Sequence, residues 1–257
     1  MSLFPIGLIA SGLAGIATFI GALPVLAIRN PSSRVIAAMT GFGGGIMLAA
    51  TAFSLIIPGT EAAISQGYAK PFAALIMVVG IVVGAWCIEL VHGLFPHEHF
   101  LKGVDGNCDN KRSRIWLFIT AITLHNFPEG MAVGVSFGSG NLNDGISTAL
   151  GIGLQNMPEG LVVALSLVAQ NYRVGYALWI SLLTGLVEPI GGLFGVGVVT
   201  VAQGILPWAM GFAAGAMLFV ICDEILPESQ KAGIERDGTI GTILGFIVMM
   251  FLDIALS

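Results

Sequence analysis

The sequence predicts an all-α membrane protein with eight transmembrane helices. Hydrophobic residues make up 56% of the 257 residues, charged residues only 10%, and the mean hydropathy is +0.92. A soluble domain needs about a quarter of charged residues to cover its surface. Because that polar coat is missing, the surface is expected to face lipid. Residues 1–257 are therefore interpreted as one membrane domain whose partner is the bilayer, with no nucleic-acid partner.

Eight segments are suited to cross a membrane, which takes about 20 mostly apolar residues. The first has no basic residues before it and is followed by Arg29 and Arg34, so it is interpreted as a retained span and not as a signal peptide. The 36 glycines indicate close helix packing. In chain order the spans are 3–28, 35–57, 71–95, 115–138, 144–169, 174–200, 206–226 and 238–256.

The basic residues predict the orientation, because cytoplasmic loops carry an excess of lysine and arginine. With the N-terminus outside and alternating spans, all of the ten basic residues except Lys70 fall on the cytoplasmic side. This predicts that both termini are extracytoplasmic. The longest loop, about 96–114, is then cytoplasmic.

Two pairs of spans share sequence motifs. The fourth span contains HNFPEG (125–130) and the fifth contains QNMPEG (155–160). A looser match links residues 41–48 of the second span with 211–218 of the seventh. Similar composition could explain the looser match, but not the two N-x-P-E-G blocks. The members of each pair run in opposite directions, so the sequence predicts an inverted repeat, which is typical of transporters with a site near the membrane midplane.

Ionisable side chains deep inside the spans mark the candidate site, because such residues are costly in a membrane and face a cavity or a partner. Helix positions three and four apart share one face, so each motif gathers its polar residues on one side. Pro128 and Pro158 each leave a carbonyl of the preceding turn without its donor, which indicates kinked, hydrated helix segments. The candidate residues are His125, Asn126, Glu129, Gln155, Asn156, Glu159 and Glu188.

The charge of this constellation predicts bound cations. No lysine or arginine lies within the spans to neutralise the glutamates. A chain of protonated carboxylates that carries only protons is the alternative, but it gives the amides and the His-x-x-x-Glu spacing no role. Imidazole, carboxylate and amide ligands suit divalent zinc, iron or manganese. Two such ions bridged by Glu129 and Glu159 would use every donor.

The paired motifs resemble the signature of the ZIP (Zrt/Irt-like protein) family of divalent metal transporters, and the whole chain is similar to its prokaryotic zinc-uptake and GufA-like branch. The resemblance implies a binuclear metal centre halfway across the membrane, and a homodimer, since family members are often dimers. It departs at Gln155 and Asn156, where other members have histidine or an acid. The implied ligands are Met47, His125, Glu129, Gln155 and Glu159 for one ion, and Asn126, Glu129, Asn156, Glu159 and Glu188 for the other.

Four further residues are weaker candidates for metal binding. Asp223 and Glu224 lie near the cytoplasmic end of the seventh span, where they could bind metal on an exit path. His97 and His99 lie in the cytoplasmic loop and could bind metal as it emerges, or could be ordinary polar loop residues.

These features predict a multi-pass protein of the cell (inner or plasma) membrane that transports divalent metal toward the cytoplasm. Zinc is the expected ion, with iron, manganese and cadmium as further substrates, and neither a prosthetic group nor an enzymatic reaction is expected. Two alternatives stay open. One is an intramembrane di-metal hydrolase, although the sequence has no H-E-x-x-H motif. The other is an exporter with the same ligands.

Overall fold

The computed structural model describes residues 4–27, 32–94, 98–99, 103–104, 111–201, 203–230 and 233–256, and these residues are almost entirely helical. The two strands are a single antiparallel pairing of two residues each. In chain order the elements are α1 (Phe4–Ala22), η1 (Leu23–Leu26), α2 (Ser33–Ala49), η2 (Ala50–Ile56), α3 (Ile57–Ser65), α4 (Lys70–Leu94), β1 (Glu98–His99), β2 (Gly103–Val104), α5 (Lys111–Gly138), α6 (Leu142–Ala169), α7 (Val174–Gly185), α8 (Glu188–Val201), η3 (Gln203–Ile205), α9 (Leu206–Val220), η4 (Ile221–Ile225), α10 (Leu226–Ser229) and α11 (Glu235–Leu256).

The prediction of an all-helical membrane protein is confirmed. Seven helical segments of the described chain are long and apolar enough to cross a membrane, and they overlap seven of the eight predicted spans. The remaining predicted span, 115–138, lies within the 28-residue helix α5, which packs against α6 and α8. The seven segments are Phe4–Leu26, Ser33–Ser65, Lys70–Leu90, Leu142–Val168, Val174–Val199, Leu206–Ser229 and Glu235–Ala255. The chain is a multi-pass membrane protein.

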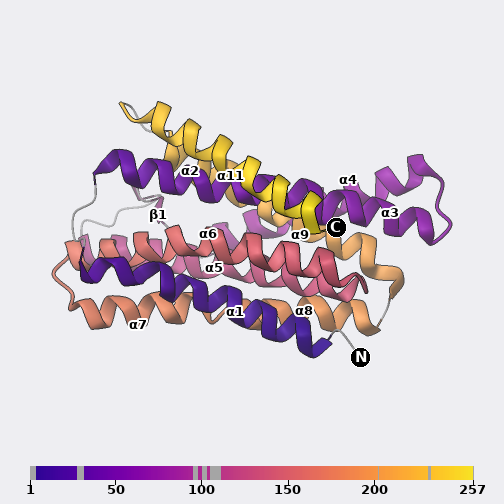
Figure 1. The fold of residues 1–257 in the computed structure, drawn as a ribbon, viewed down its shortest axis with the longest axis horizontal. Coiled ribbons are helices and arrows are strands. Elements are labelled where there is room, and N and C mark those ends of the chain that lie inside the picture. The colour runs from indigo at the N-terminus through magenta and orange to yellow at the C-terminus, as the bar shows by residue number, and fades with distance from the viewer. Residues whose placement is uncertain are drawn as a thin grey trace.

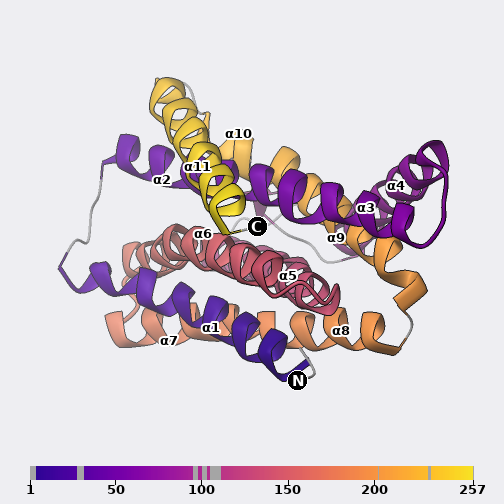
Figure 2. The same ribbon diagram turned by 45° about the vertical axis from the view of Figure 1, so that its right-hand side comes forward.

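The helices form two groups that pack side by side. One group contains α1, α5, α6, α7 and α8, and the other contains α2, α3, α4, α9 and α11 (Figures 1 and 2). The most extensive packing lies within the groups, between α1 and α6, α5 and α8, α2 and α11, and α4 and α9. The groups meet where α6 contacts α2 and α11, and where α5 contacts α9.

Glycines let the paired helices approach closely. A Cβ atom on Gly45 of α2 would collide with the carbonyl oxygen of Thr242 in α11, and one on Gly215 of α9 with the carbonyl oxygen of Ile81 in α4. Gly45 and Gly215 occupy matching places in the looser pair of motifs. Small residues at these crossings provide the close backbone contact on which packing in a membrane depends.

Two predicted spans differ from the structure. The second does not end at residue 57: α2, η2 and α3 form one helical segment through Ser65, and η2 is a π-helix. The sixth, 174–200, is not one continuous helix: α7 ends at Gly185, α8 begins at Glu188, and the break lies at residues 186–187. Pro189 is the second residue of α8, where proline is tolerated because the first N–H groups of a helix have no helical acceptor.

Both ends of the described chain lie at the same end of the bundle, together with the connection between α3 and α4 (Figure 1). The starts of α2 and α7 lie at the opposite end (Figure 1). There Arg34 forms an exposed ion pair with Asp237, with 3.8 Å between Nε and Oδ2. The assignment of these ends to the two sides of the membrane stays a prediction.

Candidate metal centre

The two motif helices lie side by side on the face of their group that is turned toward the other group (Figures 1 and 2). Asn126 and Glu129 of α5 have no exposed surface, and the same holds for Gln155 and Asn156 of α6. Glu159 is half-buried. Both helices continue through their prolines, so the polar residues of each motif stay on one face.

Three carboxylates come together here. Glu129 lies close enough to Glu159 and Glu188 for electrostatic repulsion, and Glu188 lies close enough to Glu159. Glu188 reaches the motif helices because α8 begins with it, directly after the break that follows α7. The chain contains no lysine or arginine between Arg114 and Arg173. Acidic side chains are therefore concentrated in a region to which the motif segments bring no lysine or arginine.

Hydrogen bonds fix the orientation of both asparagine amides. Nδ2 of Asn126 donates to the carbonyl oxygen of Thr184 at 2.8 Å. Nδ2 of Asn156 donates to the carbonyl oxygen of Ala14 at 2.9 Å and to Oε1 of Glu188 at 2.5 Å. Only the amide nitrogen can donate to these oxygens, so Oδ1 of each asparagine is left to accept.

Most of the acceptor oxygens at this place have no hydrogen-bond partner in the described part of the chain. They are Oδ1 of Asn126 and of Asn156, both carboxylate oxygens of Glu129, Oε1 of Gln155 and Oε2 of Glu188. The Gln155 amide lies beside Glu129, but neither of its polar atoms meets hydrogen-bonding geometry. An unmatched buried polar group costs about 1–3 kcal/mol. Carboxylate and amide oxygens are ligands for divalent cations, so this set of atoms is able to hold them.

The described contacts place only some of the predicted ligands at this site. Met47 is buried in an apolar cluster that includes Met217 of α9 and also Met131 of α5 and Ala14 of α1, and its role as a ligand stays a prediction. His125 lies in α5, but its side chain is outside the described part of the structure. Among the described side chains, no group of three His, Cys, Asp or Glu residues is placed to hold a metal ion by itself. A metal site here needs the amide oxygens, or side chains beyond those described.

Only some of the weaker candidates lie within the described structure. Asp223 and Glu224 are half-buried in η4, the π-helix that follows α9. His97 lies outside the described residues, and His99 is in β1 with its side chain outside them. The strand β1 packs against α5, whereas η4 packs against α2, α9 and α10.

A polar cluster near the C-terminal end of α11 was not identified from the sequence. Asp253 accepts hydrogen bonds through Oδ1 from Ser54 of η2 at 2.7 Å and from Ser147 of α6 at 3.1 Å. Asp253 is also close to Asp144. These residues come from three segments far apart in the chain, so no local spacing could have linked them.

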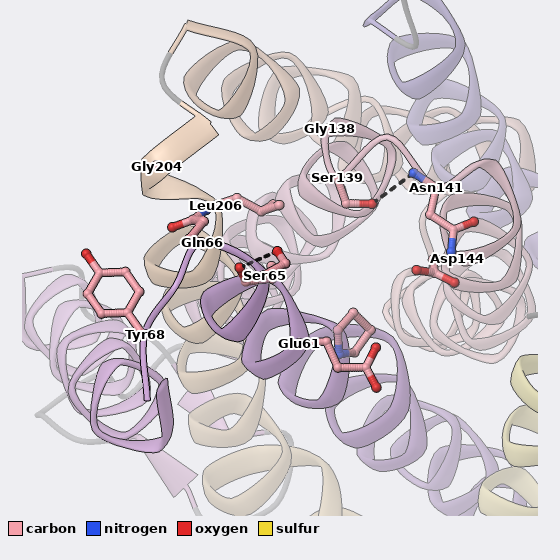
Figure 3. Close-up of a pocket in the computed structure, with 12 residues that line it drawn as sticks. Glu61, Ser65, Gln66, Tyr68, Gly138, Ser139, Asn141, Asp144, Gly204 and Leu206 are labelled. Atoms are coloured by element: carbon pink, nitrogen blue, oxygen red, sulfur yellow. Dashed lines mark hydrogen bonds between the residues drawn. The ribbon is translucent and has the colours of Figure 1, made fainter. Parts of the chain in front are cut away.

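An open cavity of about 670 Å³ lies at the same end of the bundle, between α3 and the connection of α5 to α6. Glu61 and Asp144 line it, together with Ser139 and Asn141 (Figure 3). Acidic and neutral polar side chains thus surround a space that opens to the outside of the protein.

Comparison with known proteins identifies the family. The family model for the ZIP zinc transporter matches residues 96–253. The chain is 47% identical over 251 residues to "Zinc transporter GufA" of Myxococcus xanthus, which covers 98% of this chain and 99% of that protein. It is 44% identical to "Zinc transporter ZIPB" of Bordetella bronchiseptica (97% and 81%) and 36% identical to "Zinc transporter ZupT" of Chlorobium luteolum (97% and 97%). With its two motif helices inside the matched region, this chain belongs to the ZIP zinc transporter family.

Proposed function

We propose that this protein transports divalent transition-metal ions across the cell membrane toward the cytoplasm, with zinc as the main substrate and iron, manganese and cadmium as further ones. The relatives are named zinc transporters, and not hydrolases, so we propose transport and no enzymatic reaction. The observation that carries the proposal is the set of buried acceptor oxygens without partners on the two motif helices, in a region of concentrated negative charge.

Two ions are proposed to share the site. The ion nearer to α8 would bind the free oxygens of Asn126, Asn156 and Glu188, and both ions would bind Glu129 and Glu159. This is supported by the amide orientations, which leave both Oδ1 atoms as acceptors. The other ion would bind Gln155, supported by its free Oε1. Met47 and His125 are assigned to that ion by the family resemblance.

We propose that transport occurs by movement of one helix group relative to the other. The support is the pairing of helices. The motifs relate α5 to α6 and α2 to α9. The related helices also have corresponding packing partners: α5 packs on α8 and α6 on α1, while α2 packs on α11 and α9 on α4. An inverted repeat predicts such matched pairs, and transporters with inverted repeats commonly alternate access by moving one repeat or bundle.

The proposed path runs from the cavity lined by Glu61 and Asp144 to the buried oxygens. From there metal would leave past Asp223 and Glu224 toward the loop that contains His97 and His99. The acidic lining of the cavity supports its role as the entrance, because negative charge raises the local concentration of cations.

The proposal is tested by uptake of radioactive zinc into proteoliposomes. The wild-type protein is expected to accumulate zinc, and Glu129→Ala and Glu159→Ala should each abolish accumulation because the shared ligand is lost. Glu89→Ala is the control, since Glu89 is an exposed glutamate of α4. Normal uptake by both variants at wild-type protein levels would contradict the bridging assignment. No protein-dependent uptake by the wild type would contradict transport itself.

A further inference from the structure

Thr18 of α1 has a buried hydroxyl that the proposed site does not use. Its side chain is 1% exposed, and Oγ1 has no hydrogen-bond partner among the described residues. A helical threonine commonly donates to the carbonyl four residues earlier, as Thr51 does to Met47 at 2.8 Å. For Thr18 that carbonyl belongs to Ala14, and it already accepts from Asn156 of the metal centre.

Thr18 occupies the place in α1 that Glu188 occupies in α8. Gly15 and Gly185 pack against each other, so that a Cβ atom on either would collide with the carbonyl oxygen of the other. Thr18 follows Gly15 by three residues, and Glu188 follows Gly185 by three. Each residue then packs against the glycine of one motif: the carbonyl oxygen of Glu188 lies against Gly130, and that of Thr18 against Gly160.

The hydrogen bonds of the two asparagine amides show the same correspondence between α1 and the segment formed by α7 and α8. Asn156 of α6 donates to the carbonyl before Gly15, and Asn126 of α5 donates to the carbonyl before Gly185. Asn156 also donates to the Glu188 carboxylate. The corresponding partner of Asn126 would be Thr18, whose side chain is shorter and makes no such bond in the described structure. The hydroxyl is next to the end of α7, since a Cβ atom on Gly185 would lie 2.8 Å from Oγ1.

We propose that Thr18 supplies a neutral oxygen ligand to the metal centre, opposite the Glu188 carboxylate, and thereby tunes which divalent ions the centre prefers. This rests on the proposed function, because it assigns one more ligand to the same site. A hydroxyl is a hard oxygen donor, which suits manganese and zinc better than the softer cadmium. The side of the centre next to α8 then provides a carboxylate, and the side next to α1 provides a neutral oxygen.

The test replaces the oxygen by sulfur in the full-length protein. Purified Thr18→Cys, Thr18→Ser and Thr18→Val are compared with wild type for binding of manganese and of cadmium by isothermal titration calorimetry. We expect Thr18→Cys to raise the cadmium-to-manganese affinity ratio about tenfold, Thr18→Val to weaken manganese binding about tenfold, and Thr18→Ser to behave as wild type. Ser11→Cys is the matched control, because Ser11 is buried in the same helix and donates to Leu8 at 3.1 Å.

An unchanged ratio for Thr18→Cys, in protein that melts as wild type does, would overturn the inference. If the variants fail to fold, anomalous scattering from manganese in wild-type crystals decides: a metal within about 2.6 Å of Oγ1 supports it, and a more distant metal overturns it. Failure of the proposed function would give a different result: wild-type protein would bind no divalent metal, or Glu129→Gln would bind it as well as wild type does.

Discussion

At the scale of single residues, Glu129 is the carboxylate whose surroundings most favour a bound cation. It has no exposed surface, neither of its carboxylate oxygens has a donor among the described residues, and two further carboxylates lie nearby. Burying a charge without a partner is strongly unfavourable. A side chain in this position therefore destabilises the metal-free protein and is well placed to bind a cation. Asn126 and Asn156 differ, because their nitrogens are satisfied and only their oxygens are left to accept.

This balance predicts opposite effects of one substitution with and without metal. Glu129→Gln removes a buried charge, so the metal-free variant is expected to melt at a higher temperature than the metal-free wild type. Zinc at a hundred times its Kd should stabilise the wild type by about 2.7 kcal/mol. The variant should lose most of that gain. Thermal unfolding in detergent, with and without zinc, measures both effects.

Glu89→Gln serves as the control for this measurement, because it removes an exposed carboxylate of α4. It should leave the zinc-dependent stabilisation unchanged. A Glu129→Gln protein that zinc stabilises as much as it does the wild type would show that Glu129 is not a ligand.

At the scale of elements, the helix crossings determine where the polar groups stand. α1 lies close enough to α6 for the Ala14 carbonyl to accept from Asn156, and the break between α7 and α8 presents the Thr184 carbonyl to Asn126. Glycines allow these approaches, because a Cβ atom on Gly130 or Gly160 would collide with the backbone of the neighbouring helix. The π-helical segments η2 and η4 follow α2 and α9 at similar places in the looser motif pair.

The close crossings predict that alanine is poorly tolerated at Gly45. Its Cβ atom would overlap the backbone of α11, so Gly45→Ala is expected to lower the free energy of unfolding by about 1–3 kcal/mol. Gly197 of α8 is the matched control, since nothing lies within 4 Å of the position of its Cβ atom. Gly197→Ala should instead be neutral or stabilise by about 0.5–1 kcal/mol. Denaturant titration of both variants measures the difference, and equal stabilities would contradict the packing argument.

At the scale of the whole molecule, the distribution of basic residues predicts how the two helix groups are oriented in the membrane. Both ends of the described chain lie at one end of the bundle, and the cavity with Glu61 and Asp144 lies between α3 and the start of α6. Asp253 links the groups, because it belongs to α11 and accepts from Ser147 of α6. Movement of the groups would have to break this hydrogen bond.

The orientation is tested by the labelling of single cysteines in intact cells. Ala69→Cys, in the connection before α4, should react with a membrane-impermeant thiol reagent added outside. Gly175→Cys, at the start of α7, should react only after the membrane is permeabilised. Both positions are exposed. The native cysteines, replaced by serine in this background, are Cys87, Cys108 and Cys222. The reverse pattern of labelling would overturn the predicted orientation.

The sequence alone determined the features that depend on local periodicity and on solvent. Apolar length predicted the spans because the lipid interior demands it, and helix periodicity placed Asn126 beside Glu129 and Asn156 beside Glu159. Tertiary structure decided the rest. The sixth span breaks just before Glu188, the Ala14 and Thr184 carbonyls orient the two amides, and Ser54 and Ser147 meet at Asp253. These contacts join residues distant in the chain, and they form only when helices approach at glycines whose partners no local pattern reveals.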